Sequence, residues 1–242
     1  MGLIEIQNLC KSFDGRTVLH DVDLSVESGT TVVILGKSGT GKSVLLKCIV
    51  GLLAPDAGSI RVDGQEIVGM EFSRLNALRK RMGFLFQNSA LYDSMSVRDN
   101  LACPLRRNTL LTEGELEQRV VEELQKVGLR ESIDKMPADL SGGMRKRVGL
   151  ARSLITNPEF MFYDEPTTGL DPITGREMSS LILELERQRK TTSIAVTHDM
   201  VCARTIADKV AVLDNGVIRH EGTIEMMEQV DDRLVQSFFL GP

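Results

Sequence analysis

The sequence is poor in the residues that build metal centres and disulfide frameworks. Its four cysteines, Cys10, Cys48, Cys103 and Cys202, lie far apart and form no C-x-x-C pair, and only three histidines accompany them. Structural zinc sites take their ligands from closely spaced cysteines and histidines. We therefore expect no zinc site, and we expect reduced thiols, as in a cytosolic protein.

Other absences limit where the chain works and what it binds. A net charge of −5 leaves no basic stripe for nucleic acid, and the local exception at 79–81 (Arg-Lys-Arg) is interpreted as a solvated helix face. Residues 1–5 lack the basic-then-apolar layout of a signal peptide. No apolar run approaches the roughly 20 residues of a membrane span. Any role at a membrane is thus expected to come through a partner protein.

A glycine-rich loop stands between a strand pattern and a helix pattern. The apolar run 31–35 precedes Gly36-Lys37-Ser38-Gly39-Thr40-Gly41-Lys42-Ser43, and a helical pattern begins at Val44. This is the P-loop pattern G-x-x-x-x-G-K-[ST], whose backbone N–H groups hold phosphates at the start of a helix. In such a loop Lys42 neutralises the β- and γ-phosphates and Ser43 ligates Mg²⁺. The sequence thus predicts a nucleotide-binding protein.

The rest of the chain alternates between strand and helix patterns, with one interruption. Strand patterns disappear after residue 88 and return at 160, and the segment between them reads as helices only. Alternating strands and helices predict an α/β fold with a mostly parallel sheet covered by helices. We predict one domain over 1–242, with a core of 1–87 and 158–222, a helical subdomain of 88–157 and a helical tail of 223–242.

Two adjacent carboxylates follow a buried strand pattern. The run 160–163 leads directly into Asp164 and Glu165, and sites in parallel sheets lie at the carboxyl ends of strands. One carboxylate can hold Mg²⁺ while its neighbour takes a proton from the attacking water. Strands also often end in acidic turns, so the pair indicates a catalytic site only in combination with the P-loop.

The segment Ser141-Gly142-Gly143 opens a predicted helix. Its backbone N–H groups and the helix dipole could form a second anion site. The alternative is a plain serine cap with glycines beside it. Because the chain already has a complete phosphate loop, a second anion site suggests contact with a nucleotide held elsewhere.

These features together resemble the ATP-binding-cassette (ABC) ATPases over essentially the whole chain. The motifs occur in the family's order: Walker A at 36–43, the Q-loop Gln87, the signature at 140–144, Walker B at 160–165, the D-loop at 169–171 and the switch His198. Phe13, which by itself could equally be a core or turn residue, falls where the family stacks adenine. The resemblance implies an ABC-type P-loop NTPase fold, with a RecA-like core, an antiparallel β subdomain and an inserted helical subdomain.

The resemblance also implies roles for these residues. Members form head-to-tail dimers that hold two ATP molecules, each between Walker A of one subunit and the signature of the other, so Ser141 and Gly143 would touch the partner's γ-phosphate. Glu165 would be the general base, His198 would sense the γ-phosphate, and Gln87 would link the metal site to the helical subdomain. The implied cofactors are ATP and Mg²⁺, with Ser43, Gln87 and Asp164 at the metal. The implied nucleotide contacts are Phe13, Gly36, Lys37, Ser38, Gly39, Thr40, Gly41, Lys42, Ser43, Gln87, Ser141, Gly142, Gly143, Asp164, Asp171 and His198.

Three segments are similar to one group within the family. Residues 85–95, 140–147 and 171–174 resemble the ATPases of bacterial phospholipid-trafficking systems, the lipid-asymmetry (Mla) and Mce-associated transporters. The signature also ends in Met144 where most ABC relatives have glutamine, so a contact that the family assigns to that glutamine is not carried over. The similarity implies an ATPase on the cytoplasmic face of a bacterial inner membrane that works a separate permease for phospholipid or other hydrophobic cargo. The alternatives are an importer ATPase for amino acids or other polar solutes, and a non-transport ABC ATPase, either one that acts on DNA or ribosomes or one that regulates a membrane partner.

The expected partners follow from that group. They are a second copy of the chain and permease subunits, with a Mce-type substrate-binding protein and a small regulatory subunit also open, and no nucleic acid. We place the permease contact at 89–104, where Leu91, Tyr92, Met95 and Val97 form an apolar segment with an aromatic anchor. The alternative is that these side chains pack inside the helical subdomain.

Overall fold

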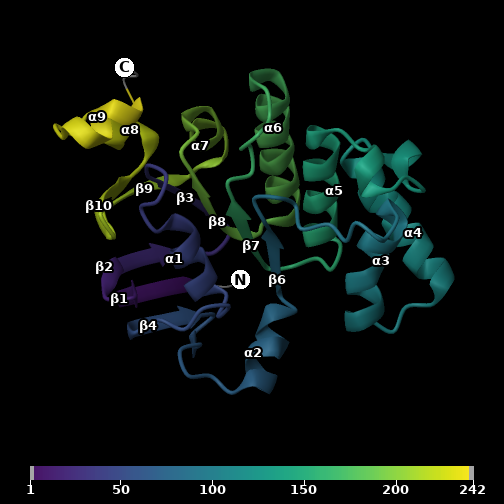
Figure 1. Cartoon of the computed structure of the whole chain (residues 1–242), viewed down its shortest axis with the longest axis horizontal. Helices are drawn as coiled ribbons and strands as arrows, with labels where there is room; N and C mark the ends of the chain where they lie inside the picture. The colour runs from purple at the N-terminus through teal and green to yellow at the C-terminus, as the bar shows by residue number, and fades with distance from the viewer. Residues whose placement is uncertain (1–2, 240–242) are drawn as a thin grey trace.

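The computed structural model describes residues 3–239, and it has the predicted mixture of strands and covering helices (Figure 1). The first two residues of the predicted core and the last three of the predicted tail, 240–242, lie outside the described residues. No helix within 3–239 is long and apolar enough to cross a membrane.

A six-stranded sheet forms the centre, in the order β10-β9-β3-β8-β7-β6. The pairs from β9 through β3, β8 and β7 to β6 are parallel, and β10 alone is antiparallel, to β9. Both β7 and β8 are buried along their whole length, as expected of strands covered on both faces. The strands are β3 (Thr31–Leu35), β6 (Met82–Leu85), β7 (Phe160–Asp164), β8 (Thr192–Thr197), β9 (Lys209–Asp214) and β10 (Val217–Gly222).

Successive residues of these strands point to opposite faces and so build two separate cores. One core packs Val32, Ile34 and Phe162 against α1 (Lys42–Ile49) and a second sheet. The other core packs Val33, Leu35 and neighbouring side chains against α5 (Gly142–Leu154), α6 (Pro172–Arg189) and α7 (Met200–Ile206). The P-loop helix α1 and the helix α5 therefore lie on opposite faces of the central sheet.

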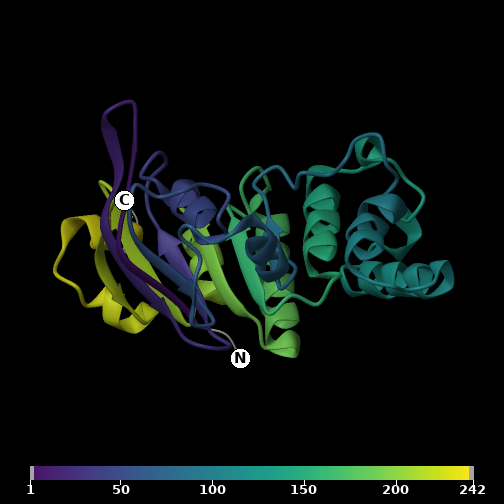
Figure 2. The ribbon, with the colours of Figure 1, turned by 90° about the horizontal axis from the view of Figure 1, so that it is seen from below.

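The second sheet is antiparallel, in the order β2-β1-β4-β5. Two tight turns shape it, and in each an aspartate followed by a glycine adopts positive φ, at 14–15 and at 63–64. In the view of Figure 2 this sheet and the C-terminal helices lie at one end of the molecule and the helical block at the other. The elements are β1 (Ile4–Phe13), β2 (Arg16–Val26), β4 (Ala57–Val62), β5 (Gln65–Glu66) and, after them, α2 (Phe72–Arg79).

The segment 88–157 contains only helices. Serine or threonine side chains cap α3, α4 and α5, and α4 has a complete capping box between Thr112 and Glu115. Its elements are α3 (Val97–Asn108), α4 (Glu113–Lys126), the 3₁₀ turns η1 (Arg130–Ser132) and η2 (Pro137–Asp139), and α5. The tail helices α8 (Ile224–Glu228) and α9 (Arg233–Phe239) pack on the α7 side of the core through Met227 and Val235.

The basic run at 79–81 is not the solvated helix face expected from the sequence. Helix α2 ends at Arg79, whose guanidinium donates to the carbonyls of Val50 and Gly51. Arg81 lies beyond the helix and forms ion pairs with Asp63 and Glu159, each at 2.7 Å. Two of the three cations thus tie separate segments together, which a local charge pattern does not indicate.

Candidate nucleotide-binding site

The loop 36–43 curls tightly between β3 and α1. The Nζ atom of Lys42 donates to the carbonyls of Gly36 at 2.7 Å and Lys37 at 3.1 Å, and the side chain is 5% exposed. Gly41 has φ near +100°, and a Cβ there would lie 3.0 Å from the carbonyl oxygen of Val18. Position 41 therefore requires glycine, and the two carbonyls keep Lys42 folded into the loop.

Ser43 and Asp164 come together from distant parts of the chain. The hydroxyl of Ser43, at the start of α1, donates to Oδ1 of Asp164 at the end of β7, at 2.7 Å. Burial raises the pKa of Asp164, and the hydroxyl of Ser43 opposes that shift. Residues 3–239 contain no cluster of three or more acidic, histidine or cysteine side chains that could hold a metal ion by itself. The donor set of one hydroxyl and one carboxylate nevertheless fits Mg²⁺, which keeps waters and phosphate oxygens as further ligands.

The carboxylate of Glu165 is held from several sides. His198 Nδ1 lies 2.9 Å from Oε2, and the hydroxyls of Thr168 and Thr197 donate to the same oxygen at 3.1 and 3.2 Å. Lys42 Nζ lies 3.4 Å from Oε1. Burial by itself would raise the pKa of Glu165, but His198, Lys42 and Thr168 outweigh it and the pKa is lowered. The site thus keeps an ionised carboxylate 7% exposed beside the phosphate loop.

The signature segment lies away from this group. Ser141 caps α5 by accepting a hydrogen bond from the backbone of Met144, and both Ser141 and Gly142 are exposed. A Cβ on Gly143 would come within 2.7 Å of Thr174 at the start of α6, so glycine permits this close packing. Asp171 caps α6 and also accepts from the Thr174 hydroxyl. The structure thus brings the signature and the D-loop together.

Gln87 and Phe13 stand apart from the buried residues. Gln87 is exposed just after β6, and within 3–239 no hydrogen bond joins it to Ser43 or Asp164. Phe13 ends β1 with its ring 42% exposed, and the ammonium of Lys11 lies 5.3 Å from the ring centre. A half-exposed aromatic face of this kind can stack on a base.

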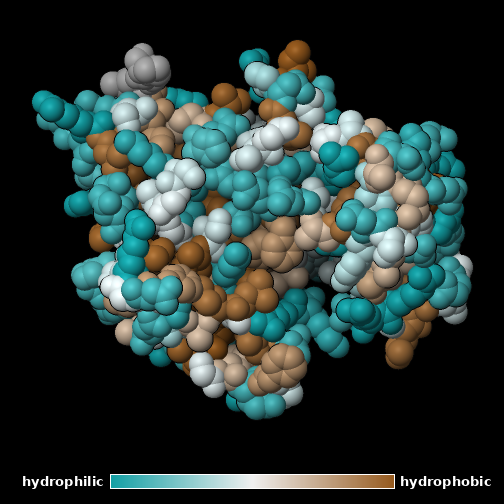
Figure 3. Space-filling model, in the orientation of Figure 1, coloured by the Kyte–Doolittle hydropathy of each residue, from teal (hydrophilic) through white to brown (hydrophobic). Residues whose placement is uncertain are grey.

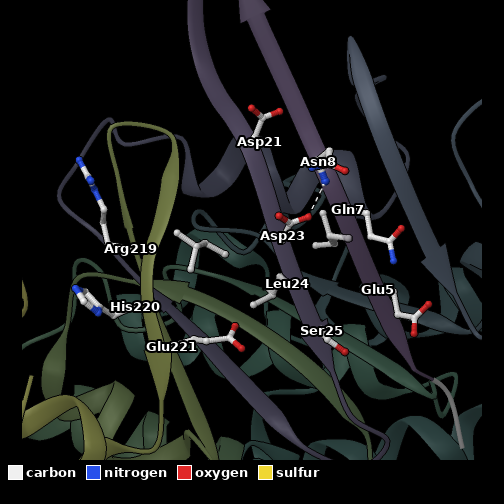
Figure 4. Close-up of a pocket in the computed structure, with 12 residues that line it drawn as sticks. Glu5, Gln7, Asn8, Asp21, Asp23, Leu24, Ser25, Arg219, His220 and Glu221 are labelled. Carbon is white, nitrogen blue, oxygen red and sulfur yellow. Dashed lines mark hydrogen bonds between the residues drawn. The ribbon is translucent and has the colours of Figure 1, made fainter.

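A cavity of about 710 Å³ lies elsewhere, between β1, β2 and β10 (Figure 4). Its lining holds four carboxylates but only one arginine, and Asp23 accepts a hydrogen bond from the backbone of Asn8 there. A triphosphate would meet repulsion in this cavity. The acidic lining residues are Glu5, Asp21, Asp23 and Glu221.

Sequence reasoning missed several groups around Glu165. Thr168 directly precedes the D-loop at 169–171 and Thr197 directly precedes His198, so their adjacency to these motifs is the signal in the sequence. Lys146 donates to the backbone carbonyl of Glu165 at 3.0 Å. Nothing in the local pattern around Lys146 distinguishes it from an exposed lysine.

A phosphate loop with a buried lysine, a hydroxyl–aspartate pair and a held carboxylate define the site of a P-loop nucleotide hydrolase. The sequence matches the family model described as ABC transporter over residues 19–168. The chain belongs to the ABC transporter family and is an ATP-hydrolysing subunit.

Individual relatives agree with this membership. The chain is 42% identical to the probable ribonucleotide transport ATP-binding protein mkl of Mycobacterium leprae, over 100% of this chain and 70% of the relative. It is 41% identical to the intermembrane phospholipid transport system ATP-binding protein MlaF of Haemophilus influenzae, over 99% of this chain and 91% of the relative. It is 40% identical to the methionine import ATP-binding protein MetN 2 of Pseudomonas entomophila, over 92% of this chain and 68% of the relative.

Solved structures give the same result. A dimeric ATP-binding cassette in a post-hydrolysis state, bound to ADP and Pi, superposes with a TM-score of 0.84 and 29% identity, covering 91% of this chain and 98% of that one. The predicted ABC-type P-loop fold and the predicted resemblance to the Mla group are thereby confirmed.

Proposed function

We propose that this ATPase drives the movement of phospholipid or another hydrophobic cargo through a separate permease on the cytoplasmic face of a bacterial inner membrane. The similarity to MlaF over 91% of that relative supports this cargo class. A polar-solute importer is the second candidate, supported by the 40% identity to a methionine import ATPase. Neither the fold nor the nucleotide site distinguishes the two, because cargo contacts belong to the permease.

For the chemical step we propose that ATP phosphates bind the loop 36–43 and Lys42, with adenine on Phe13. Mg²⁺ would lie at Ser43 and Asp164, with Gln87 reaching it once nucleotide is bound, and it would neutralise the phosphate oxygens. Glu165 orients the attacking water and accepts its proton, since its lowered pKa keeps it ionised. His198, which contacts the same carboxylate, lies where it can respond to the γ-phosphate.

The observation that carries the proposal is the separation of the two phosphate-binding elements. Lys42 begins α1 on one face of the central sheet, whereas Ser141 caps α5 on the other face and is exposed. A helix start that lies exposed in one subunit is available to a nucleotide on a second subunit. We therefore propose a head-to-tail dimer with two shared sites, in which Ser141, Gly142, Gly143 and Asp171 act across the interface.

A groove between core and helical block is the proposed permease contact. A cavity of about 290 Å³ lies there, and Figure 3 shows this face hollowed between α2 and the helical block. Of the segment 89–104, Tyr92, Cys103 and Pro104 line the cavity, whereas Val97 packs inside. Tyr92 is 46% exposed and stacks under Arg152, whose Nη1 has no partner among the described residues.

The charge of this groove indicates what docks in it. Its lining contains no acidic residue but four basic ones, Arg79, Lys80, Arg107 and Arg152. We propose that the permease segment in the groove presents carboxylates to Lys80 and Arg107, the two exposed cations of the lining. A Mce-type binding protein and a small regulatory subunit complete the proposed assembly.

The test is purification of the native complex from detergent extract, followed by reconstitution into vesicles. A co-purified permease and movement of fluorescent phospholipid that requires ATP would support the proposal. If methionine or another polar solute stimulates ATP hydrolysis by the complex and no lipid moves, the polar-solute importer would be favoured.

A further inference from the structure

The side chain of Lys146 is buried against the backbone that directly follows β7. Lys146 lies on α5, its side chain is 5% exposed, and its Nζ donates to the backbone carbonyl of Glu165 at 3.0 Å. Burial lowers the pKa of Lys146 to about 8, and the nearby Glu165, Asp164 and Cys202 only partly oppose the shift. An ammonium in such a place reduces the stability of the fold, so packing is a poor reason for its presence.

The carbonyl that Lys146 holds belongs to an unusual backbone. Glu165 has φ near +51°, a left-handed backbone conformation that residues other than glycine rarely adopt. Its N–H donates to the carbonyl of Val196 at 2.9 Å, and its own carbonyl accepts from the backbone of Thr168 at 3.3 Å and from Lys146. Among these contacts, Lys146 alone comes from the helical segment 88–157.

We propose that Lys146 is a positioning residue for ATP hydrolysis. Its ammonium holds the Glu165 carbonyl and thereby fixes the direction of the carboxylate, so that a shift of α5 relative to the core changes the geometry of the base. The ATPase would thus sense the position of its own helical block within one subunit. This inference rests on the proposed role of Glu165 as general base.

The first test compares two substitutions that remove the donor, Lys146→Met and Lys146→Leu. We expect kcat to fall about tenfold to a hundredfold in both, as for a small misplacement of a reacting group. The KM for Mg-ATP should stay within about twofold, and the stability to chemical denaturation should not decrease. Lys126→Met, which removes an ammonium from α4 without contact to Glu165, is the matched control and should keep the wild-type kcat.

The second test uses dimer formation, a readout that does not depend on turnover. On size-exclusion chromatography with Mg-ATP, Glu165→Gln and the double variant Glu165→Gln/Lys146→Met should dimerise equally. Loss of the dimer in the double variant would overturn the proposal, because Lys146 would then act on binding or folding.

The remaining outcomes distinguish the role of Lys146 from the proposed role of Glu165 as general base. Wild-type kcat in Lys146→Met, with Glu165→Gln inactive, overturns the role of Lys146 and leaves the base in place. Turnover in Glu165→Gln at the wild-type rate overturns the base itself. A lower kcat in only one of the two Lys146 variants, or a loss of stability in both, would assign Lys146 to packing.

Discussion

The imidazole Nδ1 of His198 lies 2.9 Å from Oε2 of Glu165, although 32 residues separate the two in the chain. The contact forms because β7 and β8 are parallel neighbours whose carboxyl ends coincide, with Asp164 opposite Val196. Each residue follows the end of its strand directly, so the pairing of the strands fixes the pairing of the side chains.

Glu165→Gln should abolish hydrolysis but preserve nucleotide binding. The amide cannot accept the proton of the attacking water, and removal of a positioned base costs a factor of about 10²–10⁴. Phosphate release measures the loss, and size-exclusion chromatography with Mg-ATP should show a stable dimer. A variant that stays monomeric and still hydrolyses ATP contradicts this role.

Lys42→Ala should weaken ATP binding about 10- to 100-fold, the range for the loss of hydrogen bonds to a charged group. The ammonium that Gly36 and Lys37 now hold is the one cation folded into the phosphate loop in the described structure. Equilibrium binding of a fluorescent ATP analogue measures the change. Hydrolysis at the wild-type rate in this variant would show that the loop is not the phosphate site.

Ser141→Arg should act across the dimer interface. The homodimer should lose turnover while each subunit still binds ATP through its own P-loop. Mixing Ser141→Arg with Lys42→Ala subunits places both lesions at one site of the heterodimer, so activity of the other site can return. Full activity of the Ser141→Arg homodimer would exclude the shared site.

The pH dependence of folding should reveal Lys146. The pKa of Lys146 is about 8 in the folded protein and 10.5 in the unfolded chain. Between these pH values the unfolded state binds more protons, so the free energy of unfolding rises with pH, by about 3 kcal/mol in all. Cys48 and Cys202, with pKa values raised by burial to about 11 and about 12, act in the opposite direction above pH 9. The comparison of Lys146→Met with the wild type in urea cancels them. The gain in stability from the substitution should be greatest at pH 7 and shrink towards pH 10.

Tyr92→Glu should break the permease contact without harming the isolated ATPase. The new carboxylate would pair with Arg152 and repel an acidic docking segment. Leu110→Glu, a fully exposed residue of the same block outside the groove, is the control. Basal phosphate release should be unchanged in both, and pull-down of the permease should fail only for Tyr92→Glu. Unchanged pull-down would move the contact elsewhere.

Sequence was sufficient where chemistry depends on near neighbours. The loop 36–43, the pair Asp164 and Glu165, and the helix start at Ser141 each consist of consecutive residues at the end of one element, and such patterns are local. The structure brings Ser43 and Asp164 together, as their common assignment to Mg²⁺ implies, whereas the contact of His198 with Glu165 was not predicted from the sequence. Their assigned roles stay predictions.

What sequence could not give are contacts that depend on tertiary burial. Arg81 lies in a basic run but pairs with Asp63 and Glu159 in separate segments. Lys146 follows the signature as an ordinary helical lysine, yet its ammonium is enclosed and donates to the Glu165 carbonyl just beyond β7. Neither result follows from spacing, since the partners are set by how distant elements cross.

The separation of α1 and α5 on opposite faces of the sheet has a kinetic consequence. Because one subunit alone carries only half of each proposed site, the rate of hydrolysis by the purified chain should be second order in protein when most of it is monomeric. Halving the concentration would then cut the rate about fourfold, until the dimer saturates. A permease that holds two copies side by side would abolish this dilution effect, which gives the membrane partner control over the ATPase without any change at the nucleotide.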